Sequence, residues 1–283
     1  MTAGEPTVGG AIETQSGSTA ASVSRSVELA FATDLAVRAG ALLRDRLGRV
    51  ESVRHKSAKD VVTEVDHLSE ALIIEAISAT FPGDGILAEE SGLAASDNGR
   101  IWIVDPLDGT INYANGIPLF CVAIGLVVDA VPSVGVVHDP VRAETFAATR
   151  DGPAQLDGRP IQVSTKDRLS DFVISLAIDG PVRSERLDTI RDEIRVSRRL
   201  GSAALALAYT AAGRFDAFAQ THGLSAWDVA AAGLIVERAG GSVTDASGGP
   251  WFDLGRATPT FGIVAAPPAH QPRLLELVGT PPG

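Results

Sequence analysis

The chain has 283 residues, of which 45% are hydrophobic and 21% are charged, and its formal net charge is −11. This length allows a large core, in one domain or in two halves packed together. The absence of lysine- and arginine-rich runs argues against a nucleic-acid-binding protein, and no apolar stretch approaches the roughly 20 residues of a membrane-spanning helix. The single cysteine, Cys121, excludes an internal disulfide, is expected to be a small core residue and fits a cytoplasmic protein.

The first half of the chain predicts helices and closely spaced strands. Residues 1–25 are rich in small and hydroxyl residues and predict a disordered tail, after which Ser26 is a candidate N-cap for a helix over 27–47. A second helix is expected over 66–81, with Leu68 on its buried side. Short turns between the strands favour an antiparallel sheet. The expected strands are 61–63, 85–87, 101–104, 122–128 and 134–137.

The second half alternates strands and helices, which predicts a mixed or parallel sheet. The expected strands are 172–176 and 262–265, and the expected helices are 183–191, 202–212 and 228–239. The pattern changes near residues 155–162. We therefore predict an N-terminal α+β half that binds metal, residues 26–158, and a C-terminal α/β half, residues 159–276.

Four short segments place acids or hydroxyls where helix and strand patterning does not require them. The segments are 60–66, 88–91, 105–110 and 226–228. Taken singly, each acid has an ordinary structural explanation. The ordinary roles are helix N-caps for Asp66 and Asp228, and turns for Glu89, Asp105 and Asp108.

Segment 105–110 is explained least well by these ordinary roles. It places two carboxylates three residues apart at the carboxyl end of an apolar strand. Pro106 fixes the turn, Gly109 lets the backbone approach a ligand, and the Gly109 and Thr110 amides begin the next helix, where an anion is favoured. Carboxylates and a phosphate repel each other unless a cation lies between them. Oxygen ligands suit magnesium, and the chain lacks the Cys/His cluster of a zinc site.

Together, the four segments resemble the inositol monophosphatase family of magnesium-dependent, lithium-sensitive phosphatases. Residues 105–113 and 116–118 match the first signature of this family, and residues 227–241 match the second. The resemblance extends over about residues 27–266. It implies a layered αβαβα sandwich of the sugar-phosphatase type, with an antiparallel sheet in the N-terminal half and a mixed or parallel sheet in the C-terminal half, and it implies a homodimer.

The resemblance also implies a site with two or three Mg²⁺ ions. The implied ligands are Glu89, Asp105 and the Leu107 carbonyl for the first ion, and Asp105, Asp108 and Asp228 for the second. Two such metals can activate the attacking water and stabilise the leaving oxygen, so that phosphate passes directly to water. The implied catalytic residues are Thr110, Asp66 and Glu89, with Thr110 oriented by Asp66 to position the water.

Further residues are implied to bind the substrate or to support the metal site. Glu90 would support the ligand geometry, and Lys56 would help to close the metal site from a flexible loop. The implied substrate-binding residues are Gly109, Thr110, Asp108, Gly201, Ser202, Ala203, Gln220 and Asp228.

The choice of substrate depends on departures from the family pattern. Gln220 occupies the position where inositol-preferring members carry glutamate, and the stretch 220–227 is one residue longer than the family pattern. Ile111 stands where branches that act on histidinol phosphate or on 3′-phosphoadenosine nucleotides often carry lysine. We therefore expect hydrolysis of inositol monophosphate or of a similar polyol or sugar phosphate. Histidinol phosphate is the first alternative, followed by fructose 1,6-bisphosphate and 3′-phosphoadenosine nucleotides.

A hypothesis of another class is a non-catalytic regulatory or binding protein that has kept the fold. The sequence argues against it, because all the expected metal carboxylates are present together with Thr110 and Asp66.

Overall fold

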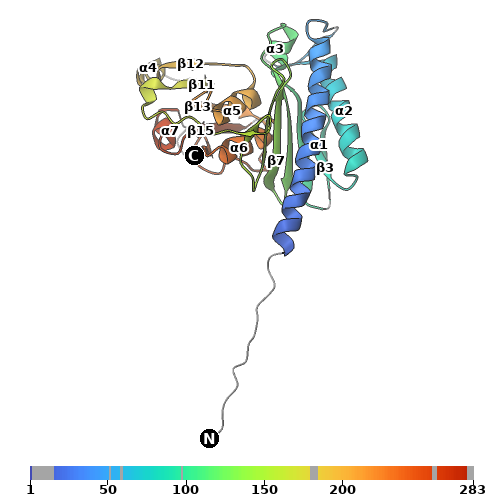
Figure 1. Cartoon of the computed structure of the whole chain (residues 1–283). Coiled ribbons are helices and arrows are strands. Elements are labelled where there is room, and N and C mark those ends of the chain that lie inside the picture. Colours follow the sequence, from blue (N-terminus) through green and yellow to red (C-terminus); the bar gives the residue numbers. More distant parts are fainter. Residues whose placement is uncertain are drawn as a thin grey trace.

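The structure has five layers in the order helices, sheet, helices, sheet, helices (Figure 1). It is a computed structural model and describes residues 1, 16–50, 52–57, 60–96, 98–178, 184–256 and 260–278. Three hydrophobic clusters hold these layers together. One lies between the first helices and the first sheet, one surrounds the middle helices and contacts both sheets, and one lies between the second sheet and the last helices. The expected αβαβα sandwich is confirmed. Within the described ranges, no helix combines the length and the apolar character that crossing a membrane requires.

The first outer layer contains α1 (Ser16–Arg46) and α2 (Glu64–Thr80), which pack on one face of the first sheet. α1 begins well before Ser26, so the prediction of Ser26 as an N-cap is wrong. Residues 16–25 contain poor helix formers, but extending an existing helix costs far less than nucleating one. Residues 2–15 of the predicted tail lie outside the described residues.

α2 begins with a capping box. The Thr63 hydroxyl accepts a hydrogen bond from the Val65 amide (3.2 Å), and the Asp66 carboxylate accepts one from the Thr63 amide (2.9 Å). Thr63 is therefore the N-cap, and the prediction of Asp66 as N-cap is corrected, because Asp66 is the third residue of the helix. Leu68 is 42% exposed rather than buried, because the buried face of α2 runs through Ser69.

The first sheet contains eight strands in the order β10-β9-β8-β7-β6-β5-β3-β4. Every neighbouring pair is antiparallel except β3 and β5, which are parallel. β4 and β8–β10 were not predicted, because they are short or lack a long apolar run. The strands are β3 (Gly85–Ala88), β4 (Gly92–Ala94), β5 (Arg100–Asp108), β6 (Cys121–Val128), β7 (Val131–Asp139), β8 (Glu144–Thr149), β9 (Gln155–Leu156) and β10 (Arg159–Pro160), and a separate hairpin contains β1 (Val53–Ser57) and β2 (Asp60–Thr63).

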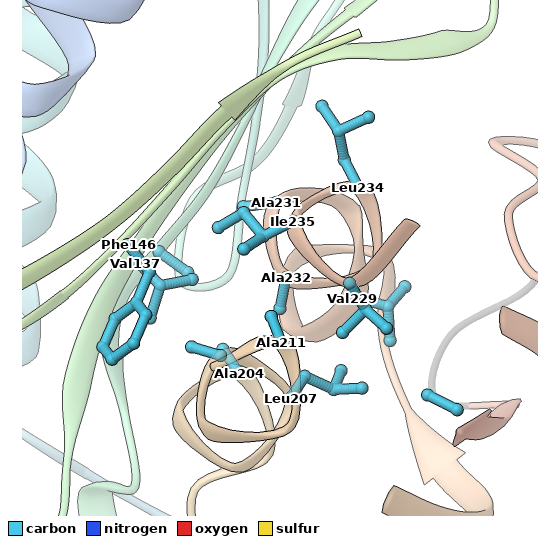
Figure 2. Packing of buried hydrophobic residues seen from close by; sticks show 14 of the residues in the cluster. Val137, Phe146, Ala204, Leu207, Ala211, Val229, Ala231, Ala232, Leu234 and Ile235 are labelled. Carbon is cyan, nitrogen blue, oxygen red and sulfur yellow. The ribbon is translucent and has the colours of Figure 1, made fainter. Parts of the chain in front are cut away.

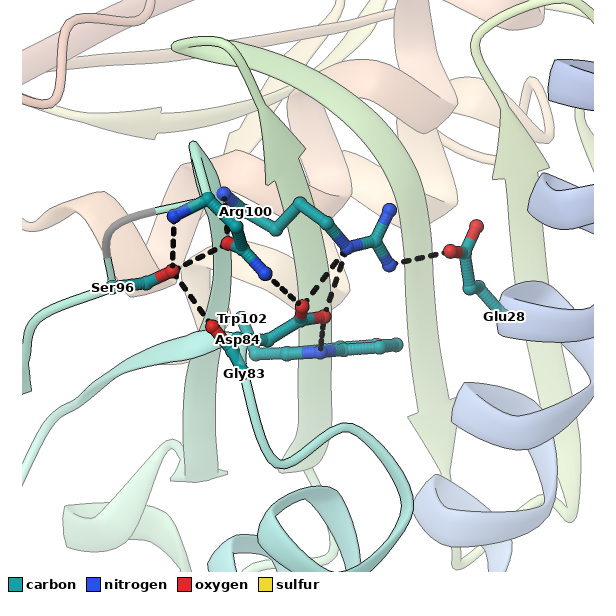
Figure 3. Close-up of polar contacts among 7 residues, drawn as sticks. Glu28, Gly83, Asp84, Ser96, Arg100 and Trp102 are labelled. Atoms are coloured by element: carbon teal, nitrogen blue, oxygen red, sulfur yellow. Dashed lines mark hydrogen bonds and ion pairs between the residues drawn. The ribbon is translucent and has the colours of Figure 1, made fainter.

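A polar network around Arg100 joins α1 to the first sheet (Figure 3). The guanidinium donates to Asp84 Oδ1 (3.0 Å) and to Glu28 Oε1 (2.5 Å) of α1. Asp84 also accepts a hydrogen bond from the Trp102 indole (2.9 Å). The side chains of Glu28 and Asp84 are only 4% and 5% exposed, so Arg100 neutralises two buried acids.

The middle layer contains α5 (Ala203–Ala211) and α6 (Ala226–Arg238), whose small and branched apolar side chains pack between the two sheets (Figure 2). α6 lies very close to β7. A Cβ atom on Gly135 of β7 would lie 2.5 Å from the Ala231 carbonyl oxygen, whereas one on Gly125 of β6 would lie 3.4 Å from its nearest neighbour. Glycine at position 135 therefore allows the helix to approach the sheet.

α6 also begins with a capping box. Ser225 is the N-cap, and the Asp228 carboxylate accepts a hydrogen bond from the Ser225 amide (2.5 Å). The prediction of Asp228 as N-cap is corrected in the same way as that of Asp66. In both helices the aspartate occupies the third position, where its side chain lies over the helix end.

The second sheet has the strand order β12-β11-β13-β15-β14 and is mixed, as predicted. β12, β11 and β13 are parallel, while β13, β15 and β14 are antiparallel. α4 (Ser184–Glu193) and α7 (Gln271–Val278) form the last layer. The division into residues 26–158 and 159–276 stays a prediction. The strands are β11 (Val173–Ala177), β12 (Val196–Arg198), β13 (Ala217–Leu224), β14 (Ser242–Asp245) and β15 (Phe261–Ala266), and a 3₁₀ turn (Leu169–Asp171) precedes β11.

Candidate active site

A strand, a tight turn and a short helix carry the segment singled out in the sequence. β5 continues to Asp108, and α3 (Thr110–Ala114) begins after Gly109, which is its N-cap. Gly109 has a φ of 98°, and a Cβ atom there would lie 2.9 Å from the Leu119 carbonyl oxygen. Only glycine fits this turn, because it tolerates the left-handed backbone and the close approach.

Three carboxylates from two elements converge beside this turn. Asp105 and Asp108 lie at the end of β5, and Asp228 lies in the first turn of α6. Each offers an oxygen, and these oxygens all lie within 4.8 Å of one another. Glu89 follows β3, the parallel neighbour of β5, and lines the same cavity of about 160 Å³. The predicted acidic segments are therefore brought together.

The electrostatics of this cluster favour a bound cation. Burial raises the pKa of the Asp105 carboxyl well above its usual range, and the neighbouring carboxylates raise it further. Burial also raises the pKa of Asp108. Like charges this close oppose each other's ionisation unless a cation lies among them. Since the donor atoms are carboxylate oxygens, the site fits a hard divalent cation such as Mg²⁺.

A hydroxyl and a carboxylate lie next to the cluster. Thr110 Oγ1 is 3.0 Å from Asp66 Oδ1 and 3.0 Å from the Leu107 carbonyl oxygen. Asp66 is held in place by the amide and hydroxyl of Thr63, at 2.9 Å and 2.5 Å from Asp66 Oδ2. A hydroxyl has one proton, so a Thr110 hydroxyl that donates to Asp66 still offers lone pairs to a water molecule. The expected pairing of Thr110 with Asp66 is therefore present.

Asp108 links the first sheet to α5 as well as belonging to the cluster. Its Oδ2 accepts hydrogen bonds from Ser202 Oγ (2.6 Å) and from the Ala204 amide (2.7 Å), and its Oδ1 accepts one from the Ala203 amide (3.2 Å). Asp108 thus caps the N-terminus of α5, although α5 lies far away in the sequence. The carboxylate cluster and the start of α5 share one side chain.

A larger cavity of about 350 Å³ lies beside the cluster. It shares Asp108, Ile111, Gly201 and Asp228 with the smaller cavity. The predicted substrate-binding residues Ser202, Ala203 and Gln220 also line the larger cavity, whereas Gly109 and Thr110 line only the smaller one. The wall adds Ser175, Arg199 and Phe218, among others. A ligand held at the carboxylates can therefore extend into a space with mixed polar and apolar walls.

A family model described as the inositol monophosphatase family matches residues 25–280. The chain belongs to the inositol monophosphatase family. It is therefore a phosphoric monoester hydrolase, and its carboxylate cluster could hold a metal ion.

Individual relatives agree with this family assignment. An inositol-1-monophosphatase from Synechocystis sp. is 41% identical over 266 residues, 89% of this chain and 89% of the relative. A Thermotoga maritima protein named fructose-1,6-bisphosphatase/inositol-1-monophosphatase is 39% identical over 221 residues, 78% of this chain and 85% of the relative. The crystal structure of the extragenic suppressor protein SuhB from Bartonella henselae matches with a TM-score of 0.82 at 35% identity, covering 89% of this chain and 98% of the other.

The supporting residues of this inositol monophosphatase family member are partly as expected. Cys121 is fully buried as predicted, and its sulfur lies 3.6 Å from Asp108 Oδ2. The Glu90 amide donates to Glu70 Oε2 (2.8 Å), which holds the turn that carries Glu89. The side chain of Lys56 lies outside the described residues.

Two residues of the site were missed by sequence reasoning. The Asn112 amide donates to the carbonyls of Leu119 (2.7 Å) and Leu200 (2.8 Å), which joins α3 to the segment before Gly201. Asn112 lies inside the first family signature, so its position was a usable signal. Arg199 lines the larger cavity, but no local pattern distinguishes it from the neighbouring arginines.

Proposed function

We propose that this chain hydrolyses inositol monophosphate or a similar polyol or sugar phosphate, that it requires magnesium and is inhibited by lithium, and that it acts as a cytoplasmic homodimer. One observation supports the chemistry above all others: the carboxylates of Asp105, Asp108 and Asp228 converge within 4.8 Å beside the Thr110–Asp66 pair. These groups come from three separate parts of the sequence. Their meeting at the mouth of a cavity supports a site built for a metal and an anion.

In the proposed site, oxygen ligands would hold two or three Mg²⁺ ions. Glu89, Asp105 and the Leu107 carbonyl would hold one ion, and Asp105, Asp108 and Asp228 would hold a second. Bound magnesium would neutralise the phosphate and stabilise charge on the leaving oxygen.

The chain's own residues position the reacting groups. Thr110 Oγ1 donates to Asp66 and accepts a hydrogen bond from the attacking water, which orients a lone pair of that water toward phosphorus. The amides of Gly109 and Thr110 bind phosphate oxygens at the start of α3. The alcohol part of the substrate then lies between Gly201–Ala203 and Gln220.

The walls of the larger cavity support a polyol substrate. Gln220 and Ser175 offer uncharged hydrogen-bonding groups, and Ile111 places an apolar side chain at the junction of the two cavities. Fructose 1,6-bisphosphate is the second candidate, because Arg199 lines the same wall and because the Thermotoga maritima relative carries this activity in its name. Arginine would bind a second phosphate through its fork of N–H groups.

The test is phosphate release from a panel of esters with EDTA, with magnesium, and with magnesium plus lithium. The panel contains inositol 1-phosphate, fructose 1,6-bisphosphate, histidinol phosphate and 3′-phosphoadenosine 5′-phosphate. We expect magnesium-dependent release that is highest with inositol 1-phosphate and is suppressed by lithium. No release from any of the four esters would favour the regulatory alternative.

The site assignment is tested with Asp105→Asn, which should abolish metal-dependent turnover while the circular dichroism spectrum stays unchanged. Asp34→Asn is the matched control, because this residue is exposed on α1 and should keep full activity. Near-normal hydrolysis by Asp105→Asn would refute the assignment. Light scattering during size-exclusion chromatography tests the homodimer, and a mass near that of one chain would refute it.

A further inference from the structure

Three polar side chains lie on the buried face of α2, within its first two turns. Ser69 and Glu70 follow Asp66 by three and four positions, which places all three on one side of the helix. These residues are at most 4% exposed, and Ile73 and Ile77 continue the same side into the apolar core. Buried polar groups need hydrogen-bond partners, and each of the three finds one in a different segment of the carboxylate site.

The partner of Ser69 is the irregular end of β5. The pairing of β5 with β6 shifts between Asp105 and Asp108. Pro106 and Leu107 are buried there, so their backbone groups need partners outside this ladder. Ser69 Oγ donates to the Pro106 carbonyl oxygen at 2.9 Å, and the Leu107 amide donates to Asp105 Oδ1 at 3.0 Å.

These two hydrogen bonds hold the two sides of one peptide group. The Pro106 carbonyl and the Leu107 amide lie in a single plane, so fixing the direction of one fixes the direction of the other. By holding the carbonyl, Ser69 keeps the amide pointed at the Asp105 carboxylate. The Leu107 carbonyl follows directly in the chain, and the Thr110 hydroxyl holds it at 3.0 Å.

The partner of Glu70 is the turn after β3. The Glu90 amide donates to Glu70 Oε2 at 2.8 Å, and the Glu89 amide donates to the Val104 carbonyl oxygen of β5 at 3.2 Å. The peptide group that joins Glu89 to Glu90 is therefore held by α2, and the peptide group before it is held by β5. The backbone of Glu89 is fixed on both sides.

We propose that Ser69 and Glu70 are positioning residues, which arrange the ligands of the first proposed ion before that ion binds. Those ligands are Glu89, Asp105 and the Leu107 carbonyl. Neither Ser69 nor Glu70 lines the small cavity that the ligands share, so both act through the backbone and not by contact with the ion. The proposal rests on the proposed function, because it concerns the same metal site.

The two proposed ions then depend on different helices. α2 holds the segments that carry the ligands of the first ion. Asp108 and Asp228 complete the ligands of the second ion, and they are held by Ser202 at the start of α5 and by the Ser225 amide at the start of α6. Groups that orient metal ligands in this way change metal affinity about 10- to 100-fold when they are removed.

Isothermal titration calorimetry with Mg²⁺ tests the proposal in three variants and one control. Ser69→Ala and Glu70→Met should each raise the dissociation constant about tenfold, because a peptide group beside a ligand loses its hydrogen bond. Glu70→Gln should stay close to the wild type, since its amide oxygen accepts the same hydrogen bond without the charge. Ser133→Ala removes a buried hydroxyl that donates to the Val131 carbonyl, and this control should leave the dissociation constant unchanged.

Two calorimetric results would overturn the proposal. One is wild-type Mg²⁺ affinity in both Ser69→Ala and Glu70→Met. The other is equal weakening in Glu70→Gln and Glu70→Met, which would show that the charge of Glu70 supports the site and that its hydrogen bond to the turn does not.

Amide hydrogen exchange, followed by NMR in the metal-free protein with EDTA, provides a readout that depends neither on the ion nor on turnover. Ser69→Ala should speed exchange of the Leu107 amide about tenfold, and Glu70→Met should do the same for the Glu90 amide, each without affecting the other amide. Unchanged exchange of both amides would overturn the proposal even if Mg²⁺ affinity fell. Failure of the proposed function has a different signature: the wild-type protein would then bind no Mg²⁺, while exchange would still decide whether Ser69 and Glu70 hold these peptide groups.

Discussion

Ser202→Ala tests whether the shared carboxylate of Asp108 needs its hydroxyl donor. Ser202 is 3% exposed, and its hydroxyl donates to Asp108 Oδ2 at 2.6 Å, the shortest of the three contacts from the start of α5. A hydrogen bond to an ionised group contributes about 1.5–3 kcal/mol. The variant keeps the amides of Ala203 and Ala204, so Asp108 loses one of its donors but stays bound to α5.

The expected magnitude follows from these contacts. The free energy of unfolding without metal should fall by about 2 kcal/mol. Magnesium binding should weaken about 10- to 100-fold, because a carboxylate that has lost an orienting donor must be ordered by the metal itself. Chemical denaturation measures the first quantity, and isothermal titration calorimetry with Mg²⁺ measures the second.

The matched control is Ser133→Ala. Ser133 is 2% exposed, but its hydroxyl donates to the neutral Val131 carbonyl (3.0 Å), away from the carboxylates. This variant should lose about 1 kcal/mol of stability and keep wild-type magnesium affinity. If Ser202→Ala also bound magnesium like the wild type, the claim that α5 orients a metal ligand would be refuted.

Three further predictions concern the metal, the buried network and the close helix packing. Because the pKa of Asp105 is raised in the folded protein, the stability that this group contributes is present at low pH and is lost as pH rises through the folded-state pKa. Mg²⁺ should therefore raise the melting temperature more at about pH 7.5 than at about pH 5. Calorimetry that shows an equal rise at both pH values would contradict this prediction. Arg100→Met should cost about 3 kcal/mol in urea denaturation because it removes the cation that neutralises two buried acids, whereas the exposed Arg191→Met should cost less than about 1 kcal/mol. Equal losses would exclude a special role for the network. Gly135→Ala should cost about 2 kcal/mol and Gly125→Ala much less, since only the first Cβ atom would overlap the backbone of α6, whereas the second would make ordinary contact with it. Comparable denaturation midpoints for both variants would argue that α6 moves freely.

The features that local sequence predicted best are those that a few neighbouring residues determine. The strand, turn and helix around Gly109 follow from an apolar run, a proline and a glycine at a position that only glycine fits. The N-caps were misplaced for a local reason too. In the sequences of α2 and α6, a hydroxyl residue precedes the aspartate by three positions, and either could cap the helix. Thr63 and Ser225 occupy the N-cap positions, and Asp66 and Asp228 therefore stand at the third position of each helix.

Features that depend on distant contacts were not predictable in this way. Asp108 caps α5 only because β5 and α5 meet in the folded chain, and nothing near either segment indicates the contact. The role of Asn112 depends likewise on the distant Leu200 carbonyl. The irregular pairing of β13 with β15 after Gln220 likewise depends on Gly262 in another strand, where a Cβ atom would overlap the Thr221 carbonyl oxygen.

The position of α6 has a consequence for synthesis on the ribosome. The last strand of the first sheet ends at Pro160, but the helix that covers the inner face of that sheet ends only at Arg238. A nascent chain that has completed the first sheet therefore still exposes an apolar face, and it lacks Asp228. Such a chain needs protection from aggregation until α6 emerges. For the same reason, a fragment ending near residue 158 should be poorly soluble and unable to assemble the three-carboxylate cluster.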